Sequence, residues 1–132
     1  MNLTKTILLA ALLAFGVGCG YSSKSTTPPA PGSMPNITSL VPNSTTAGTS
    51  LGQNGLMVTG ARFNGNATVN WNGTKLVTTF VSSTQLTATV PDSDVATAGT
   101  ATVTVTNPGT SGGIYGGGTA AETSNSMTFT IN

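Results

Sequence analysis

Side chains able to perform chemistry are scarce in this sequence of 132 residues. It contains four basic and three acidic residues, one cysteine and no histidine. A serine or cysteine nucleophile needs a neighbouring base with a pKa near neutrality, and histidine is the side chain that usually supplies it. Lys24 and Lys75 lie in segments with no sign of the burial that turns a lysine into a base. The sequence therefore predicts a protein that is not an enzyme and that uses no cofactor.

Asp92 and Asp94 are the one pair of carboxylates that lie close together in the sequence. Alternate residues could present two oxygens to a calcium ion, but calcium takes about six to eight oxygen ligands and this pair lacks the others. Aspartate also begins turns, and Pro91 directly precedes the pair. We therefore expect a turn that ends a strand, and no metal site.

The single cysteine, Cys19, follows a segment with the three parts of an export signal. Lys5 supplies a positive charge, residues 7–15 form an apolar run, and small residues precede the cysteine. An apolar run of this length is too short for a membrane-spanning helix, which needs about 20 residues. Three outcomes stay open at this point: a lipid-modified cysteine, simple secretion with a free thiol, and an uncleaved anchor.

Residues 16–19, Gly-Val-Gly-Cys, resemble the lipobox of bacterial lipoproteins, with Gly16 where leucine is commonest. The resemblance implies that the signal peptide, residues 1–18, is removed and that a diacylglyceryl group, with acyl chains such as palmitate, is attached to Cys19. It further implies a cell-envelope protein held to a membrane through this lipid. Gly20 stands where a retention aspartate would sit, which favours the outer membrane, on its periplasmic or surface face, if the bacterium has one.

Residues 19–34 are rich in serine, threonine and proline and are predicted to form a flexible linker. Charged residues make up 5% of the chain, far below the roughly 25% of an ordinary soluble domain. Arg62 and Lys75 are the only cations of residues 35–132. Because duplex binding needs several cationic contacts to phosphates, we expect no nucleic-acid partner.

From residue 36 onward, short runs alternate apolar and threonine-rich positions and are separated by turn residues, a pattern typical of antiparallel strands with one wet face. No helical stripe occurs after residue 18, so helix is expected to be absent. The sequence predicts an all-β antiparallel sandwich of about seven strands over residues 35–132. The predicted strands are 37–41, 56–63, 68–71, 76–81, 85–90, 100–106 and 127–131.

Six segments in this order resemble the IPT/TIG domain, the immunoglobulin-like module of plexins and some transcription factors. The segments are 35–43, 56–63, 68–73, 81–91, 98–108 and 124–131. The resemblance implies a domain that serves interaction or structural roles. The stretch 48–55 is a little long for the family. Residues 109–123 are longer still, where the family usually turns within a few residues.

Aromatic residues fall into two groups. Trp71 is in phase with Val69 and is expected in the core, as are Phe63, Phe80 and Phe129. Tyr115 differs, because it follows Ile114 inside the glycine-rich segment 109–123. An aromatic ring among small residues is typical of recognition loops. Ile114 and Tyr115 are therefore candidate ligand contacts, and the alternative is a disordered loop whose tyrosine folds down onto the sandwich.

These observations predict a non-catalytic, lipid-anchored envelope protein that displays one immunoglobulin-like module for binding, adhesion or spacing. The expected partners are the membrane, through Cys19, and a surface protein or glycan. The alternative is a carbohydrate-binding accessory module that acts through residues 109–123.

Overall fold

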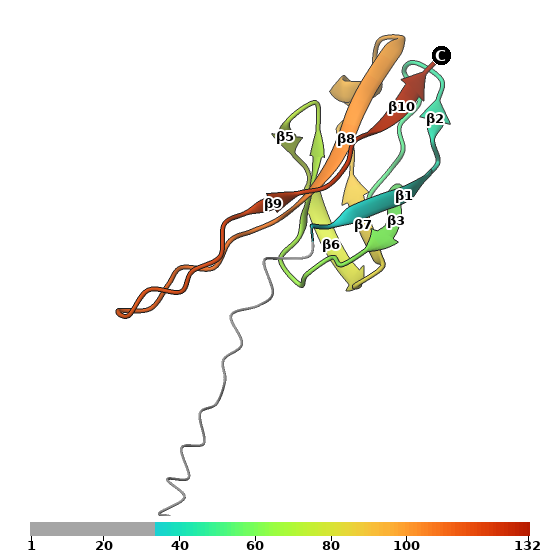
Figure 1. Cartoon of the computed structure of the whole chain (residues 1–132). Helices are drawn as coiled ribbons and strands as arrows, with labels where there is room; N and C mark the ends of the chain where they lie inside the picture. The colour runs from blue at the N-terminus through green and yellow to red at the C-terminus, as the bar shows by residue number, and fades with distance from the viewer. Residues whose placement is uncertain (1–33) are drawn as a thin grey trace, which may run out of the picture.

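The computed structural model describes residues 34–132, which fold into two packed β-sheets (Figure 1). The strands are β1 (Asn36–Val41), β2 (Ser44–Thr45), β3 (Leu56–Ala61), β4 (Thr68–Trp71), β5 (Thr74–Lys75), β6 (Val77–Ser82), β7 (Gln85–Thr89), β8 (Gly99–Asn107), β9 (Glu122–Thr123) and β10 (Met127–Ile131). The predicted all-β sandwich is confirmed. Each of the seven predicted strands is present within two residues of its expected ends. Three further strands, β2, β5 and β9, have two residues each.

One sheet has the order β1-β3-β7-β6, and the other has the order β2-β10-β8-β4-β5 with β9 also paired to β8. Every pairing is antiparallel except that of β2 with β10, which is parallel. Strand β3 is shorter than predicted because Arg62 has a φ of 63°, a left-handed conformation that a strand cannot continue through. The β4–β5 hairpin turns at Asn72 and Gly73, both with positive φ, as the Asn-Gly pair predicts.

Alternation along the strands builds the core between the sheets. Leu56 and Val58 of β3 are buried while Met57 between them is exposed, and Val103 and Val105 of β8 are buried in the same way. Each such side chain contributes about 1.5–3 kcal/mol when it is fully removed from water. Trp71 and Phe129 meet in the core with ring centroids 5.0 Å apart, tilted by 54°. Core positions for Trp71, Phe63 and Phe129 are thereby confirmed.

The expectation for Phe80 is wrong, since 41% of this side chain is exposed. Phe80 lies opposite Leu86 in the β6–β7 register, and Leu86 is fully buried. The difference arises because β6 is the last strand of its sheet, so nothing pairs on its other side. The β6–β7 register also shifts between Phe80 and Ser82. An inward position on an edge strand is covered from one side only.

One short 3-10 helix, η1 (Asp92–Val95), is present where no helix was expected. It follows Pro91, whose carbonyl oxygen accepts a hydrogen bond of 2.9 Å from the Asp94 amide. Asp92 and Asp94 lie in its first turn. The carboxylate pair therefore begins a turn after strand β7, in agreement with that part of the prediction.

Candidate functional site

Residues 108–121 form a long hairpin, here called the ribbon, which extends the β8–β9 pair beyond the end of the sandwich (Figure 1). Its two arms are joined at the Thr110–Thr119 bridge and again at the Gly113–Gly116 bridge. The Thr119 amide donates to the Thr110 carbonyl at 3.1 Å, and the two threonine hydroxyls lie 3.1 Å apart. The long segment identified in the sequence is thus a paired structure that projects from the domain.

Ile114 and Tyr115 are the two central residues of the turn at the ribbon tip. The Gly116 amide donates to the Gly113 carbonyl at 2.9 Å, which closes a four-residue turn. Gly116 has a φ of 80°, a conformation that glycine adopts without strain. Ile114 is 97% exposed and Tyr115 is 98% exposed, so the tyrosine does not fold down onto the sandwich.

Glycines let the two arms of the ribbon approach closely below the tip. A Cβ on Gly112 would lie 2.7 Å from the Gly118 nitrogen, and a Cβ on Gly118 would overlap the carbonyl oxygen of Thr110. The side chains next to the tip are therefore single hydrogens. Ile114 and Tyr115 stand as an isolated apolar pair, with no charged residue anywhere from 108 to 121.

Asparagine and serine side chains fix the base of the ribbon to the sandwich. Asn107 donates from Nδ2 to the Arg62 carbonyl at 2.8 Å, and its Oδ1 accepts from the Asn64 amide at 3.1 Å. Ser124 Oγ accepts from the Val105 amide at 2.8 Å. The ribbon therefore leaves the domain in a defined direction.

Asn125 joins the base of the ribbon to the beginning of β1. Its Oδ1 accepts from the Ile37 amide at 2.8 Å, and its Nδ2 donates to the Ile37 carbonyl at 3.0 Å. One amide side chain thus takes the place of a neighbouring strand for both backbone groups of Ile37. It also places the base of the ribbon and the entry of the chain into the domain side by side.

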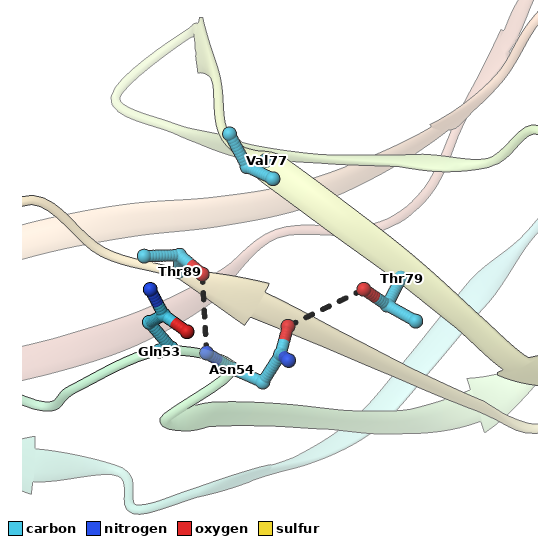
Figure 2. Close-up of a pocket in the computed structure, with 5 residues that line it drawn as sticks. All are labelled: Gln53, Asn54, Val77, Thr79 and Thr89. Atoms are coloured by element: carbon cyan, nitrogen blue, oxygen red, sulfur yellow. Dashed lines mark hydrogen bonds between the residues drawn. The ribbon is translucent and has the colours of Figure 1, made fainter.

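A second candidate is an open hollow of about 370 Å³ on the outer face of the four-stranded sheet, lined by Gln53, Asn54, Val77, Thr79 and Thr89 (Figure 2). The Asn54 amide donates to Thr89 Oγ1 at 3.1 Å, and Thr79 Oγ1 donates to Asn54 Oδ1 at 3.3 Å. The hollow holds hydroxyl and amide groups but no charged or aromatic side chain. These polar groups already bond one another, which leaves fewer of them free to bind a ligand.

Other residues singled out in the sequence do not assemble into a site. Cys19 lies outside the described residues. Among residues 34–132, no group of three or more side chains that could hold a metal ion occurs. Arg62 follows β3 and Lys75 belongs to β5 in the other sheet, and both are exposed. No helix within the described part is long and apolar enough to cross a membrane.

Sequence reasoning identified the tip residues but missed both the paired form of the ribbon and the hollow. The signal for the ribbon was present, since Thr110 and Thr119 flank a glycine-rich centre symmetrically. The signal for the hollow was weaker, because Asn54 belongs to the stretch 48–55, for which the sequence indicated only an unusual length. Its side chain bonds Thr79, which is 25 residues away in the sequence, and no local sequence pattern predicts such a contact.

Two packed sheets, antiparallel except for the β2–β10 pair, with a buried aromatic pair between them define an immunoglobulin-like module. The family model of the IPT/TIG domain matches residues 35–131. The chain therefore belongs to the IPT/TIG family. Comparison with curated proteins found no match, and neither did comparison with solved structures.

Proposed function

We propose that this chain is a non-catalytic lipoprotein of the cell envelope, which displays its IPT/TIG module on a membrane and makes its contact through the ribbon tip. The observation that carries the contact is the exposure of Ile114 and Tyr115 at 97% and 98% on a structured, projecting turn. Exposed apolar side chains on a fixed support are usual at interaction sites.

The anchor in this proposal rests on Cys19 and the apolar run before it. An acylated cysteine explains why the sole thiol stands directly after a signal segment. A single acyl chain binds membranes only marginally, whereas the several chains of a lipoprotein hold firmly. Metabolic labelling with a tagged fatty acid tests this point. Label in the wild-type chain and none in Cys19→Ser supports it, and equal label in both overturns it.

Nucleic acid is not among the partners in this proposal. Arg62 follows β3 of one sheet and Lys75 lies in β5 of the other, so the two cations of residues 35–132 form no basic patch. A salt-sensitive gel shift with DNA would contradict this part of the proposal.

A second candidate function is carbohydrate binding, which the near-complete exposure of the Tyr115 ring favours. Removal of the ribbon separates contact through the tip from contact elsewhere. Glu122 and Thr123 pair with Asn107 and Thr106, so the variant keeps these residues and replaces 108–121 with Asn-Gly. Wild type and variant are compared on a glycan array and in pull-downs from the cell surface. Binding that persists without the ribbon contradicts the assignment.

A further inference from the structure

We propose that Ile114 and Tyr115 enter the head-group region of the same membrane that holds the lipid on Cys19, so that the domain has two membrane contacts. This inference rests on the anchor of the proposed function, and it names a lipid surface as what the ribbon tip contacts.

The chemistry of the tip suits a lipid–water interface. Tyrosine combines an apolar ring with a hydroxyl and is enriched at the head-group level of membranes. Isoleucine beside it is apolar throughout. No charge occurs from 108 to 121, so approach to the apolar layer requires no ion to lose its water. Pairing at Gly113 and Gly116 also satisfies backbone groups of the tip internally.

The position of the tip relative to the anchored end of the chain supports the same conclusion. The Asn125–Ile37 hydrogen bonds hold the base of the ribbon against the beginning of β1. The chain therefore enters the domain from the end at which the ribbon projects (Figure 1). Met34, just before β1, is a further exposed apolar residue there, at 58%. A tether at this end turns the ribbon toward the bilayer.

The length of the ribbon and the number of residues between Cys19 and the domain are also compatible with contact between the tip and the bilayer. The arm from Pro108 to Ile114 has seven residues and spans at most about 23 Å at ~3.3 Å each. Sixteen residues run from Cys19 to Met34, more than twice as many as in this arm. The chain between Cys19 and the domain therefore has enough residues for the tip to reach the bilayer that holds Cys19.

The charges Arg62 and Glu122 balance at the ribbon end, so an anionic membrane surface does not repel this end. Arg62 lies at the ribbon end, held there by Asn107, and Glu122 is the one acidic residue of the domain at that end. Asp92 and Asp94 precede Gly99, which pairs with the terminal strand residue Ile131 at the opposite end of β8. Since β8 has nine residues, about 25 Å separates these two carboxylates from the base of the ribbon.

A sugar or a protein fits the tip less well. Sugar recognition needs hydrogen-bonding side chains around the aromatic ring, and here the neighbours are glycines and Ile114. A stable protein interface buries about 800 Å² on each partner, which a two-residue turn does not provide. Contact with a bilayer requires neither hydrogen-bonding side chains around the ring nor a large buried interface.

Fluorescence quenching tests the inference with the chain as the cell matures it, reconstituted through its own lipid. The vesicles contain phosphatidylethanolamine, phosphatidylglycerol and lipids brominated near the head-group end of the acyl chains. Trp71, 3% exposed, serves as the internal reference, because bromine does not reach it. Tyr115→Trp places an indole at the tip, and Ala121→Trp places one at the base of the ribbon as the matched control.

We expect Tyr115→Trp to lose about half of its tip emission, because an indole at the interface lies within reach of the bromines. Wild type and Ala121→Trp should keep their emission. An unquenched Tyr115→Trp overturns the inference, and so does equal quenching of both variants, which would mean that the domain lies flat. Tip-dependent binding on a glycan array without quenching overturns it in favour of a sugar.

A second arm separates failure of the tip from failure of the anchor. The core cluster of the described residues belongs to 37–131, so a chain that begins at Cys19 contains all of it. Coupling Cys19 to a maleimide lipid supplies the tether even if the cell leaves the thiol unmodified. In this tethered chain, the same quenching supports the tip contact and its loss contradicts it. On vesicles without a tether, Ile114→Ser with Tyr115→Ser should weaken binding by about tenfold or more.

Discussion

At the scale of single residues, Gly60 shows how closely the backbone packs at the ribbon end. A Cβ at Gly60 would overlap the Asn36 carbonyl oxygen and lie 2.6 Å from the Phe63 ring. Both neighbours are fixed, the first by strand pairing and the second by burial. We expect Gly60→Ala to lower the free energy of unfolding by about 2 kcal/mol or more.

Urea denaturation measures this effect, with Gly65→Ala as the matched control. Nothing lies within 4 Å of a Cβ on Gly65, and its φ is not in the left-handed region. The control should therefore stay within about 0.5 kcal/mol of wild type. Equal stability of the two variants would show that β1 and Phe63 can move aside without cost.

Asn125 is a second residue that we expect to stabilise the fold. It bonds both backbone groups of Ile37, which is 3% exposed. Asn125→Ala leaves a buried donor and acceptor without their partner. The expected loss is about 2–3 kcal/mol in the free energy of unfolding. Thermal or urea unfolding checks it, with Asn66→Ala at an exposed position as the control. A loss in Asn125→Ala no larger than that of the control would contradict the bridging role.

At the scale of elements, the same residue type is buried to different degrees on an edge strand and on a central strand. Phe129 lies on β10, between β2 and β8, and is fully buried, whereas Phe80 lies on the edge strand β6. Phe129→Ala should cost about 3–5 kcal/mol, because it empties a core site next to Trp71. Phe80→Ala should cost about 1 kcal/mol, because its ring is already in partial contact with water. Similar losses in urea denaturation would show that β6 is covered in solution.

The ribbon is the element with the least connection to the core. None of the buried core residues belongs to 108–121. Replacing these residues with Asn-Gly after Asn107 should therefore change the free energy of unfolding by less than about 1 kcal/mol. Circular dichroism with urea melts measures the change. A variant that unfolds markedly earlier would mean that the ribbon supports the sandwich.

Element positions could be predicted from the sequence where apolar residues alternate strictly, as in β4, β8 and β10. Alternation of apolar and polar residues indicates which face of a strand is buried. It predicts burial correctly where the strand has a paired strand on each side. The prediction of burial was wrong for Phe80, because the sequence does not indicate that β6 is the edge strand of its sheet. The short strands β2, β5 and β9 were missed for a related reason, since two residues are too few to show a period.

The tip of the candidate site could be predicted because Ile114 and Tyr115 interrupt a run of glycines. Its support could not, because Asn107 and Asn125 act through contacts 45 and 88 residues distant in the sequence. Asparagine is abundant here, and nothing local distinguishes the residues that fix the base of the ribbon from those in ordinary turns.

At the scale of the whole molecule, stability and contact are assigned to different parts of the chain. The sandwich is held by burial and strand pairing, and the single cysteine leaves no possibility of a disulfide within one chain. Ile114 and Tyr115, the proposed contact groups, project from one end, and β1 begins at the same end. With the proposed lipid on Cys19, this arrangement would give a domain of few charges a fixed orientation toward the membrane.

The mass of the N-terminal peptide of the chain purified from the envelope fraction tests the anchor most directly. The account predicts a peptide that begins at Cys19 and carries a diacylglyceryl group on its sulfur. A peptide that begins upstream of Cys19, or one that carries a free thiol at this residue, would contradict it.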